Sequence, residues 1–119
     1  MPLTNREQPL YEAKAGLFKG LSHPLRIRIL ELLSSAAEVS VADLQRDIGL
    51  EASHLSQHLS VLRRNRLVES ERRGSHVFYR LADPGVADLL AVARRLLVNV
   101  LQADRELLAD ARALPSLGS

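Results

Sequence analysis

The sequence predicts a mainly α-helical fold with one β-hairpin, arranged as a winged helix-turn-helix. Three observations support this prediction. Residues 41–65 hold two short amphipathic segments separated by a glycine. Residues 67–81 change from a helical period to two extended runs around a second glycine. Residues 86–113 then return to a helical period over their whole length.

The chain begins with nine residues that show no periodic pattern, and we interpret them as a mobile arm before a single domain spanning 10–119. Apolar residues then recur at spacings of three and four, which predicts a first helix ending near Gly20. These residues are Leu10, Ala13, Leu17 and Leu21.

A second helix is expected after Ser22, which we expect to cap it. Pro24 is tolerated there because the first-turn N–H groups of a helix have no intrahelical partner. The helix is apolar nearly all round and should therefore occupy the middle of the core, followed by a loop over residues 34–39. Its apolar residues are Leu25, Ile27, Ile29, Leu30, Leu32 and Leu33.

The helix-turn-helix begins at Ser40, which has the spacing of a capping box with Asp43. The first helix carries an apolar stripe, and Gly49 is placed to end it in a left-handed conformation. The second helix should begin near Ala52. The inward stripes comprise Val41, Leu44 and Ile48 in the first helix and Leu55, Leu59 and Leu62 in the second.

The outward face of this second helix is short, polar and free of acidic residues between 52 and 65. Hydroxyl, amide and guanidinium groups can approach base edges and phosphates, and Gln57 could pair with adenine in a major groove. The alternative is an ordinary solvated face, but such faces usually mix acidic with basic residues. The face comprises Ser53, Ser56, Gln57, Ser60 and Arg64.

The hairpin is predicted from the extended runs 67–72 and 76–81 around a turn at Arg73–Gly74. Arg72, Arg73 and His76 surround the flexible tip, where they could contact phosphates or enter a minor groove. A solvated hairpin tip without DNA contacts is the alternative.

The last helix carries a heptad seam, with apolar residues spaced alternately by four and three and interrupted only by Asp104. About 28 residues would extend roughly 42 Å, longer than so small a domain can cover by itself. We therefore predict a dimerisation helix, whose two-fold symmetry would place two recognition helices about 34 Å apart. The seam comprises Val86, Leu90, Ala93, Leu97, Val100, Asp104, Leu107, Ala111 and Leu114.

Composition limits the classes of function. The absence of cysteine excludes disulfides, thiolate metal sites and thiol redox switching. The net charge is only +2, but residues 51–80 carry six basic and three acidic side chains, so positive charge gathers in the predicted DNA-binding half. Neither a membrane-spanning run nor a signal pattern is present, which predicts a cytoplasmic protein.

The segments LSHPLRIRILELL (21–33), VADLQRDIGLEASHLSQHLSVLRRNRLV (41–68) and FYRL (78–81) resemble the ArsR/SmtB family of bacterial winged-helix transcriptional regulators. The resemblance covers roughly residues 10–99. It implies homodimers joined through the first and last helices, and operator DNA binding switched by a metal ion or another small signal. It also places Ser53, His54, Ser56 and Gln57 toward DNA. The dimer-interface candidates are Leu10, Leu17, Leu90, Leu97, Val100 and Leu107.

Several positions depart from the family pattern. Ser40, Val41, Ala42 and Asp43 stand where many relatives have a Cys-Val-Cys-Asp motif, so that thiolate metal site is absent. Of the four ligands of the family's site in the last helix, only Asp83 matches; Gly85, Leu96 and Asn99 stand at the other positions. The family also tends to have glycine where Arg66 stands, so we expect Asn65 to take the left-handed position that ends the helix.

Histidines offer the remaining metal-binding chemistry. His54 and His58 have the spacing that can chelate a metal on a helix, but we favour a packed, hydrogen-bonded His58 and a His54 that faces DNA. Asp83 and Asp88 are the weak metal candidates. Nitrogen and oxygen ligands would favour nickel, cobalt or zinc.

The sequence thus predicts a dimeric, sequence-specific DNA-binding regulator whose partners are double-stranded operator DNA and a second copy of the chain. The metal-responsive form of this hypothesis stays open, as do the operator, the signal and the direction of regulation. The alternative is a winged-helix interaction module that acts through a second regulatory protein, without a metal signal. An enzyme is rejected because Ser56 and His58 point to different faces of their helix and no acidic partner or phosphate-binding loop accompanies them.

Overall fold

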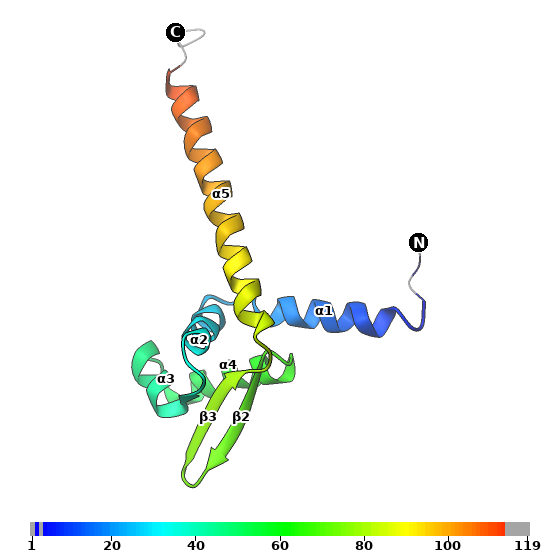
Figure 1. Ribbon diagram of the computed structural model, residues 1–119, viewed down its shortest axis with the longest axis vertical. Coiled ribbons are helices and arrows are strands. Elements are labelled where there is room, and N and C mark those ends of the chain that lie inside the picture. The colour runs from blue at the N-terminus through cyan, green and yellow to red at the C-terminus, as the bar shows by residue number, and fades with distance from the viewer. Residues whose placement is uncertain (1, 3, 114–119) are drawn as a thin grey trace. The chain divides into compact units, whose positions relative to one another are not determined.

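A three-stranded sheet and a helix-turn-helix follow two N-terminal helices in the computed structural model, which describes residues 2 and 4–113 (Figure 1). Leu114, the last residue of the predicted seam, and the arm residues Met1 and Leu3 lie outside the described residues. The chain forms two units that divide after Ala87. The elements are α1 (Gln8–Gly20), α2 (Pro24–Ser34), β1 (Val39–Ser40), α3 (Val41–Ile48), α4 (Ala52–Arg64), β2 (Val68–Arg73), β3 (His76–Leu81) and α5 (Gly85–Ala113).

This arrangement confirms the predicted winged helix-turn-helix. The core of the first unit is formed by aliphatic side chains of α2, α3, α4 and β2, of Leu67 in the turn before β2 and of Val86 at the start of α5, together with Tyr79 of β3. Each aliphatic side chain removed from water contributes roughly 1.5–3 kcal/mol, so these contacts dominate the stability of the unit. The least exposed members are Ile29, Leu30, Leu33, Leu44, Leu55, Leu62, Leu67 and Val68.

The helix α1 begins at Gln8, two residues before the predicted start, with Pro9 in its first turn. Just before it, the backbone N–H groups of Glu7 and Gln8 donate to the carbonyl of Thr4 at 3.1 and 3.0 Å. Part of the predicted arm is thus a hydrogen-bonded turn that leads into the helix.

The N-cap of α2 corrects the sequence prediction, because it is His23 and not Ser22. The backbone of His23 is extended, as the residue before a proline prefers, and its ring Nδ1 accepts a hydrogen bond from the N–H of Leu25 at 3.1 Å. The hydroxyl of Ser22 instead donates to the carbonyl of Lys19 at the end of α1.

The helix-turn-helix has the predicted local structure. The Ser40 hydroxyl accepts a hydrogen bond from the N–H of Asp43 at 3.1 Å, which caps α3. Gly49 ends α3 with φ 73°, the left-handed conformation that glycine adopts without steric cost. Between α3 and α4 there are therefore only three residues, Gly49 to Glu51.

The sheet contains one strand more than the hairpin predicted. Val39, expected in a loop, and Ser40, expected to cap the next helix, form β1, which pairs antiparallel with β3 and gives the strand order β1-β3-β2. The hairpin turn consists of Gly74 and Ser75, one residue later than predicted, because Arg73 pairs with His76. Gly74 has φ 64°, as a type II′ turn requires at its first central position.

The end of α4 also corrects a prediction, since Arg66 and not Asn65 takes the left-handed conformation, with φ 62°. The N–H of Leu67 donates to the carbonyl of Leu62, and the N–H of Arg66 to that of Arg63, which together form a Schellman motif. Asn65 keeps a negative φ of -92°, and its side-chain amide donates to the carbonyl of Val61.

Two glycines allow α1 to approach this turn closely. A Cβ added to Gly16 would lie 2.9 Å from Oδ1 of Asn65, and one added to Gly20 would lie 2.6 Å from Cδ1 of Leu67. The position of α1 therefore depends on the same turn that ends α4.

The Schellman turn predicts that Arg66→Gly stabilises the protein. A left-handed residue with a Cβ costs roughly 1–2 kcal/mol, and glycine removes that strain. We expect the free energy of unfolding in urea to increase by about 1 kcal/mol. The increase is smaller than the full strain because glycine is more flexible in the unfolded chain.

The matched control is Asn65→Gly, which should destabilise the protein because it removes the bond to Val61 without relieving strain. Stabilisation by the Asn65 substitution rather than the Arg66 substitution would contradict the assignment.

Candidate nucleic-acid interface

The helix α4 separates an apolar face from a polar one as the sequence predicts. Leu55, Leu59 and Leu62 are at most 2% exposed. The polar side chains predicted to contact DNA from this helix are all exposed, and they are Ser53, His54, Ser56, Gln57, Ser60 and Arg64. The rotation of α4 about its own axis is therefore fixed by the buried stripe.

His58 differs from these residues because it is half-buried at the contact between α4 and α2. Its ring centroid lies 4.4 Å from that of His23, and its Nδ1 lies 3.4 Å from Nη1 of Arg26. Burial is the main cause that lowers the pKa of His58 from its usual range, and the nearby His23 and Arg26 lower it further. This agrees with the hypothesis of a packed, hydrogen-bonded histidine.

The residues proposed for metal binding are not brought together. The carboxylate of Asp83 accepts a hydrogen bond from the N–H of Gly85 at 2.7 Å and thereby caps α5. Asp88 is exposed in the first turn of that helix. Within residues 2 and 4–113, no three His, Asp or Glu side chains lie in a group that could hold a metal ion.

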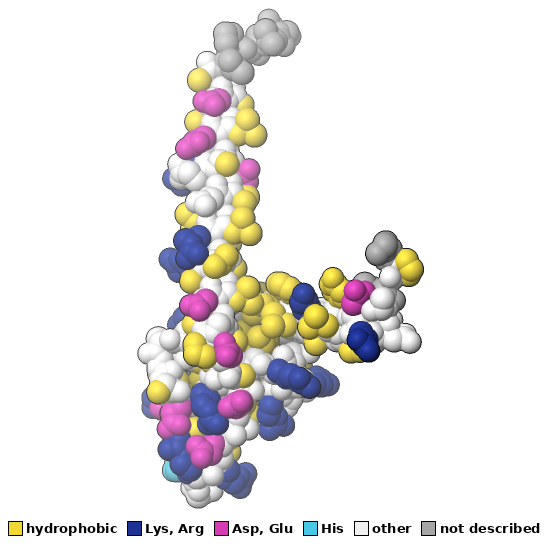
Figure 2. Space-filling model, turned by 45° about the vertical axis from the view of Figure 1, so that its right-hand side comes forward, with side chains coloured by type: hydrophobic (Ala, Val, Ile, Leu, Met, Phe, Trp, Pro, Cys, Tyr) yellow, Lys and Arg dark blue, Asp and Glu magenta, His cyan; other side chains and the backbone are white. Residues whose placement is uncertain are grey.

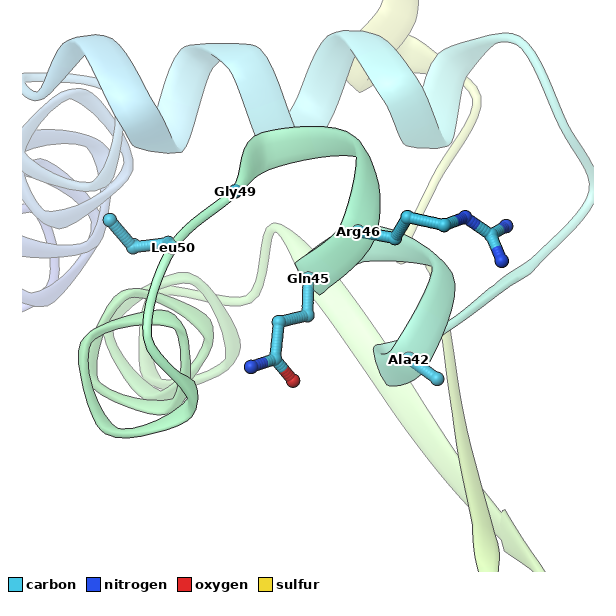
Figure 3. Close-up of a pocket in the computed structure, with 5 residues that line it drawn as sticks. All are labelled: Ala42, Gln45, Arg46, Gly49 and Leu50. Carbon is cyan, nitrogen blue, oxygen red and sulfur yellow. The ribbon is translucent and has the colours of Figure 1, made fainter.

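A shallow hollow of about 450 Å³ is lined by residues of α3 and of the turn that follows it. In Figure 3 the side chains of Gln45 and Arg46 extend from α3 in different directions, and Leu50 lies on the turn after Gly49. The sequence pattern did not indicate Gln45 or Arg46 as candidate site residues. Arg46 lies three residues after Asp43 and donates to its carboxylate at 2.7 Å, so its positive charge is partly neutralised.

The wing distinguishes the two arginines that the sequence treats alike. Arg73 forms an ion pair with Glu38, lies 3.5 Å from a carboxylate oxygen of Glu71, and stacks over the ring of Phe78 at 3.9 Å. Its pairing with Glu38 lowers the pKa of that carboxyl. Arg72 is exposed and forms no ion pair with any described residue. Arg72 is therefore better placed for a phosphate than Arg73.

Further ion pairs brace the same sheet, where Arg80 of β3 lies 3.1 Å from Glu69 and 3.9 Å from Glu71 of β2. Acidic and basic side chains consequently lie side by side over this part of the surface (Figure 2). His76 is exposed at the start of β3, with its ring centroid 6.4 Å from that of Phe78.

Among the described residues, the second unit consists of α5 from Asp88 to Ala113. Apolar side chains run along this helix in Figure 2, and their exposed fractions lie between 46% and 69%. Helical spacing places most of them on one half of the helix, a face wider than a single narrow seam. These side chains are Val92, Leu96, Leu97, Val98, Val100, Leu101, Leu107 and Leu108.

Comparison with known proteins identifies the family. A helix-turn-helix domain model matches residues 21–71. The HTH-type transcriptional regulator Rv0081 of Mycobacterium tuberculosis is 49% identical over 106 residues, covering 89% of this chain and 93% of the relative. The chain belongs to the ArsR/SmtB family of winged-helix transcriptional regulators.

Solved structures of regulators agree with this assignment. The crystal structure of M. tuberculosis Rv0081 matches with a TM-score of 0.73 and 53% identity, covering 82% of this chain and 96% of that one. The homodimeric DNA-binding domain of Mb0332 from Mycobacterium bovis, a possible ArsR-family regulator, matches with a TM-score of 0.77 and 29% identity, covering 85% and 93%. These relatives are transcriptional regulators and not enzymes, as the sequence predicts for this member of the family. None of the described helices is long and apolar enough to cross a membrane.

The wing predicts different effects for its two arginines on DNA binding. Arg72→Ala should weaken binding to every DNA sequence and reduce the slope of log affinity against log salt by about one unit, as expected for one lost phosphate contact. Arg73→Ala should change that slope less, because its charge is already paired with Glu38. Fluorescence anisotropy over a series of salt concentrations measures the affinity and the slope for each variant. Equal slopes for wild type and Arg72→Ala would show that Arg72 does not contact a phosphate.

Proposed function

We propose that this chain is a dimeric, sequence-specific DNA-binding transcriptional regulator that recognises its operator through α4. The observation that carries the proposal is the exposed, acid-free polar face of α4, opposite a leucine stripe that is at most 2% exposed. Winged-helix proteins of the helix-turn-helix class place such a helix in the major groove. The family assignment supports the same role.

Within this proposal the side chains divide by chemistry. Gln57 has an amide that can pair with adenine through two hydrogen bonds, while Ser53, Ser56 and Ser60 can contact bases or phosphates. Arg64 and Arg72 supply charge for the phosphate backbone. His54 of α4 and His76 of β3 are exposed and can donate hydrogen bonds.

The second copy of the chain is proposed from the apolar face of α5. So many exposed aliphatic side chains on a single helix require a partner surface, and a symmetric pair would bury them. The sequence candidates Leu10, Leu97, Val100 and Leu107 are exposed in the single chain, while Leu17 and Leu90 are half-buried. The homodimeric state of the Mb0332 domain supports this part of the proposal.

Metal control by nickel, cobalt or zinc has weaker support. Asp83 already caps a helix, and the family's metal ligands are replaced at most positions. The residues present therefore do not fit the family's known metal sites, and the proposed DNA recognition includes no metal-dependent step. A role that requires a second regulatory protein instead of DNA is the alternative, and it predicts no steep salt dependence for binding to DNA.

Base recognition predicts that Gln57→Ala weakens binding to a DNA site selected with the wild-type protein by about 1–3 kcal/mol, while binding to unrelated DNA barely changes. Titration of both DNAs measures the difference. Gln8→Ala is the control, because Gln8 lies in α1 and outside the helix-turn-helix. Equal losses on both DNAs would contradict base recognition by Gln57.

Dimerisation predicts that Leu97→Glu dissociates the dimer, because an unpaired carboxylate in an apolar seam costs several kcal/mol. Multi-angle light scattering should show a smaller mass, and affinity for the selected site should fall because the paired geometry is lost.

Arg95→Glu is the matched control for this experiment. It introduces the same side chain two residues away, on the opposite face of the helix, and should leave the dimer intact. A dimer that survives Leu97→Glu with normal DNA affinity would show that the α5 seam is not the dimer interface.

A further inference from the structure

Arg26 joins three helices at one point of the first unit. Arg26 lies in α2, and its guanidinium donates to the carbonyls of Gly20 at 2.8 Å and Lys19 at 3.1 Å. These hydrogen bonds cap the end of α1. The remaining nitrogen, Nη1, lies 3.4 Å from Nδ1 of His58 in α4. Arg26 therefore connects the inward side of α4, at His58, to both N-terminal helices.

The geometry determines which nitrogen of His58 carries a proton. An arginine guanidinium can only donate hydrogen bonds, so Nδ1 of His58 must be the acceptor. In the neutral ring, the proton is then on Nε2. Nδ1 is consequently the only atom that can bind a further proton, and that proton would point at a permanent positive charge.

His23 is in the same situation. Its Nδ1 accepts the N–H of Leu25 and caps α2, so its neutral ring also carries the proton on Nε2. Protonation of His23 at Nδ1 would place a donor against a donor and remove the cap. The two ring centroids lie 4.4 Å apart, so a positive charge on His23 disfavours protonation of His58.

The surroundings do not compensate such a charge. The charged or titratable groups near His58 are His23 and Arg26 of α2 and His54 of α4 itself, while Lys19 of α1 contributes a carbonyl to Arg26. On β2, which also packs against α4, Glu69 and Glu71 are paired with Arg73 and Arg80. Among the described residues, no carboxylate forms an ion pair with either histidine.

We propose that His23, Arg26 and His58 form a proton-sensitive clamp that holds α4 at neutral pH and releases it in acid. Protonation at Nδ1 of either histidine breaks the Arg26–His58 contact or the α2 cap, and the recognition helix loses part of its support. The consequence for DNA rests on the proposed function, since weakened seating of α4 lowers operator affinity only if α4 contacts the operator.

The sign of the effect on stability follows from the direction of the shift. The pKa of His58 is lower in the folded protein than the usual value of 6.5. The unfolded chain therefore binds its proton first as pH falls. The contribution of His58 to stability is complete above pH 6.5 and is lost as pH falls through the folded-state pKa.

The first test needs no DNA. Nitrogen-15 NMR of the histidine rings should show His23 and His58 with the proton on Nε2 at pH 7.5. The pKa of His58 should lie below the usual histidine value of 6.5. A ring proton on Nδ1 of neutral His58, or a His58 pKa at or above 6.5, would overturn the clamp.

The second test compares the pH dependence of variants. His58→Gln retains an oxygen that can accept from Arg26 but cannot titrate, whereas His76→Gln removes a histidine far from the clamp in the sequence. Between pH 7.5 and 5.5, urea stability should fall for wild type and His76→Gln and fall clearly less for His58→Gln. Identical pH profiles for wild type and a folded His58→Gln would overturn the proposal, and the NMR test of wild type remains decisive if that variant does not fold.

The third test measures binding to a DNA site that is selected at pH 7.5 from random sequences. Wild-type affinity for this site should fall by on the order of tenfold more than that of His58→Gln between pH 7.5 and 5.5, as expected for the loss of one or two hydrogen bonds. A normal stability shift without any DNA binding would contradict the proposed function and leave the clamp intact. DNA binding with equal pH dependence in both proteins would reject control of the operator by the clamp.

Discussion

The burial of three leucines along α4 is the constraint on which the proposed function depends. Leu55, Leu59 and Leu62 follow each other at spacings of four and three and are removed from water almost completely. Each contributes roughly 1.5–3 kcal/mol through burial, which far exceeds the energy of any exposed hydrogen bond on the same helix. The side of α4 that faces outward is therefore determined by the side that faces inward.

Hydrogen bonds at helix ends then determine where this helix lies. The Schellman turn at Arg66 ends α4 and offers α1 a surface that only glycines can approach closely. Arg26 fastens the end of α1 and contacts His58. The two N-terminal helices thus support the helix whose opposite face is proposed to contact DNA.

Sequence periodicity predicted much of this fold, because side chains that face the core recur along the sequence at the period of the helix or strand that carries them. It identified α3, α4 and α5, the turn at Gly49, and which face of α4 is exposed. It could not identify β1, because two residues are too few to show a period and their strand character comes from pairing with β3. Local alternatives of similar energy explain the other errors. Ser22 and His23 could each cap α2, and Asn65 and Arg66 could each end α4.

The candidate site was likewise predictable only in part. Exposure of Ser53, Ser56 and Gln57 follows from helical spacing, whereas the roles of Arg72 and Arg73 depend on contacts across the sheet. Arg73 is engaged by Glu38, thirty-five positions earlier in the sequence, and no local pattern indicates that pairing. The cluster of His23, Arg26 and His58 is hidden for the same reason, since its members come from two separate helices.

The most direct test of paired recognition through α4 is selection of binding sites from random double-stranded DNA with the purified chain. Two recognition helices related by a two-fold axis predict an inverted repeat whose half-site centres lie about 10–10.5 base pairs, one helical turn, apart. Inserting about five base pairs between the half-sites should then abolish tight binding, because the second half-site is turned to the opposite side of the duplex. Enrichment of a single asymmetric site, or affinity that does not depend on the spacing, would contradict this account.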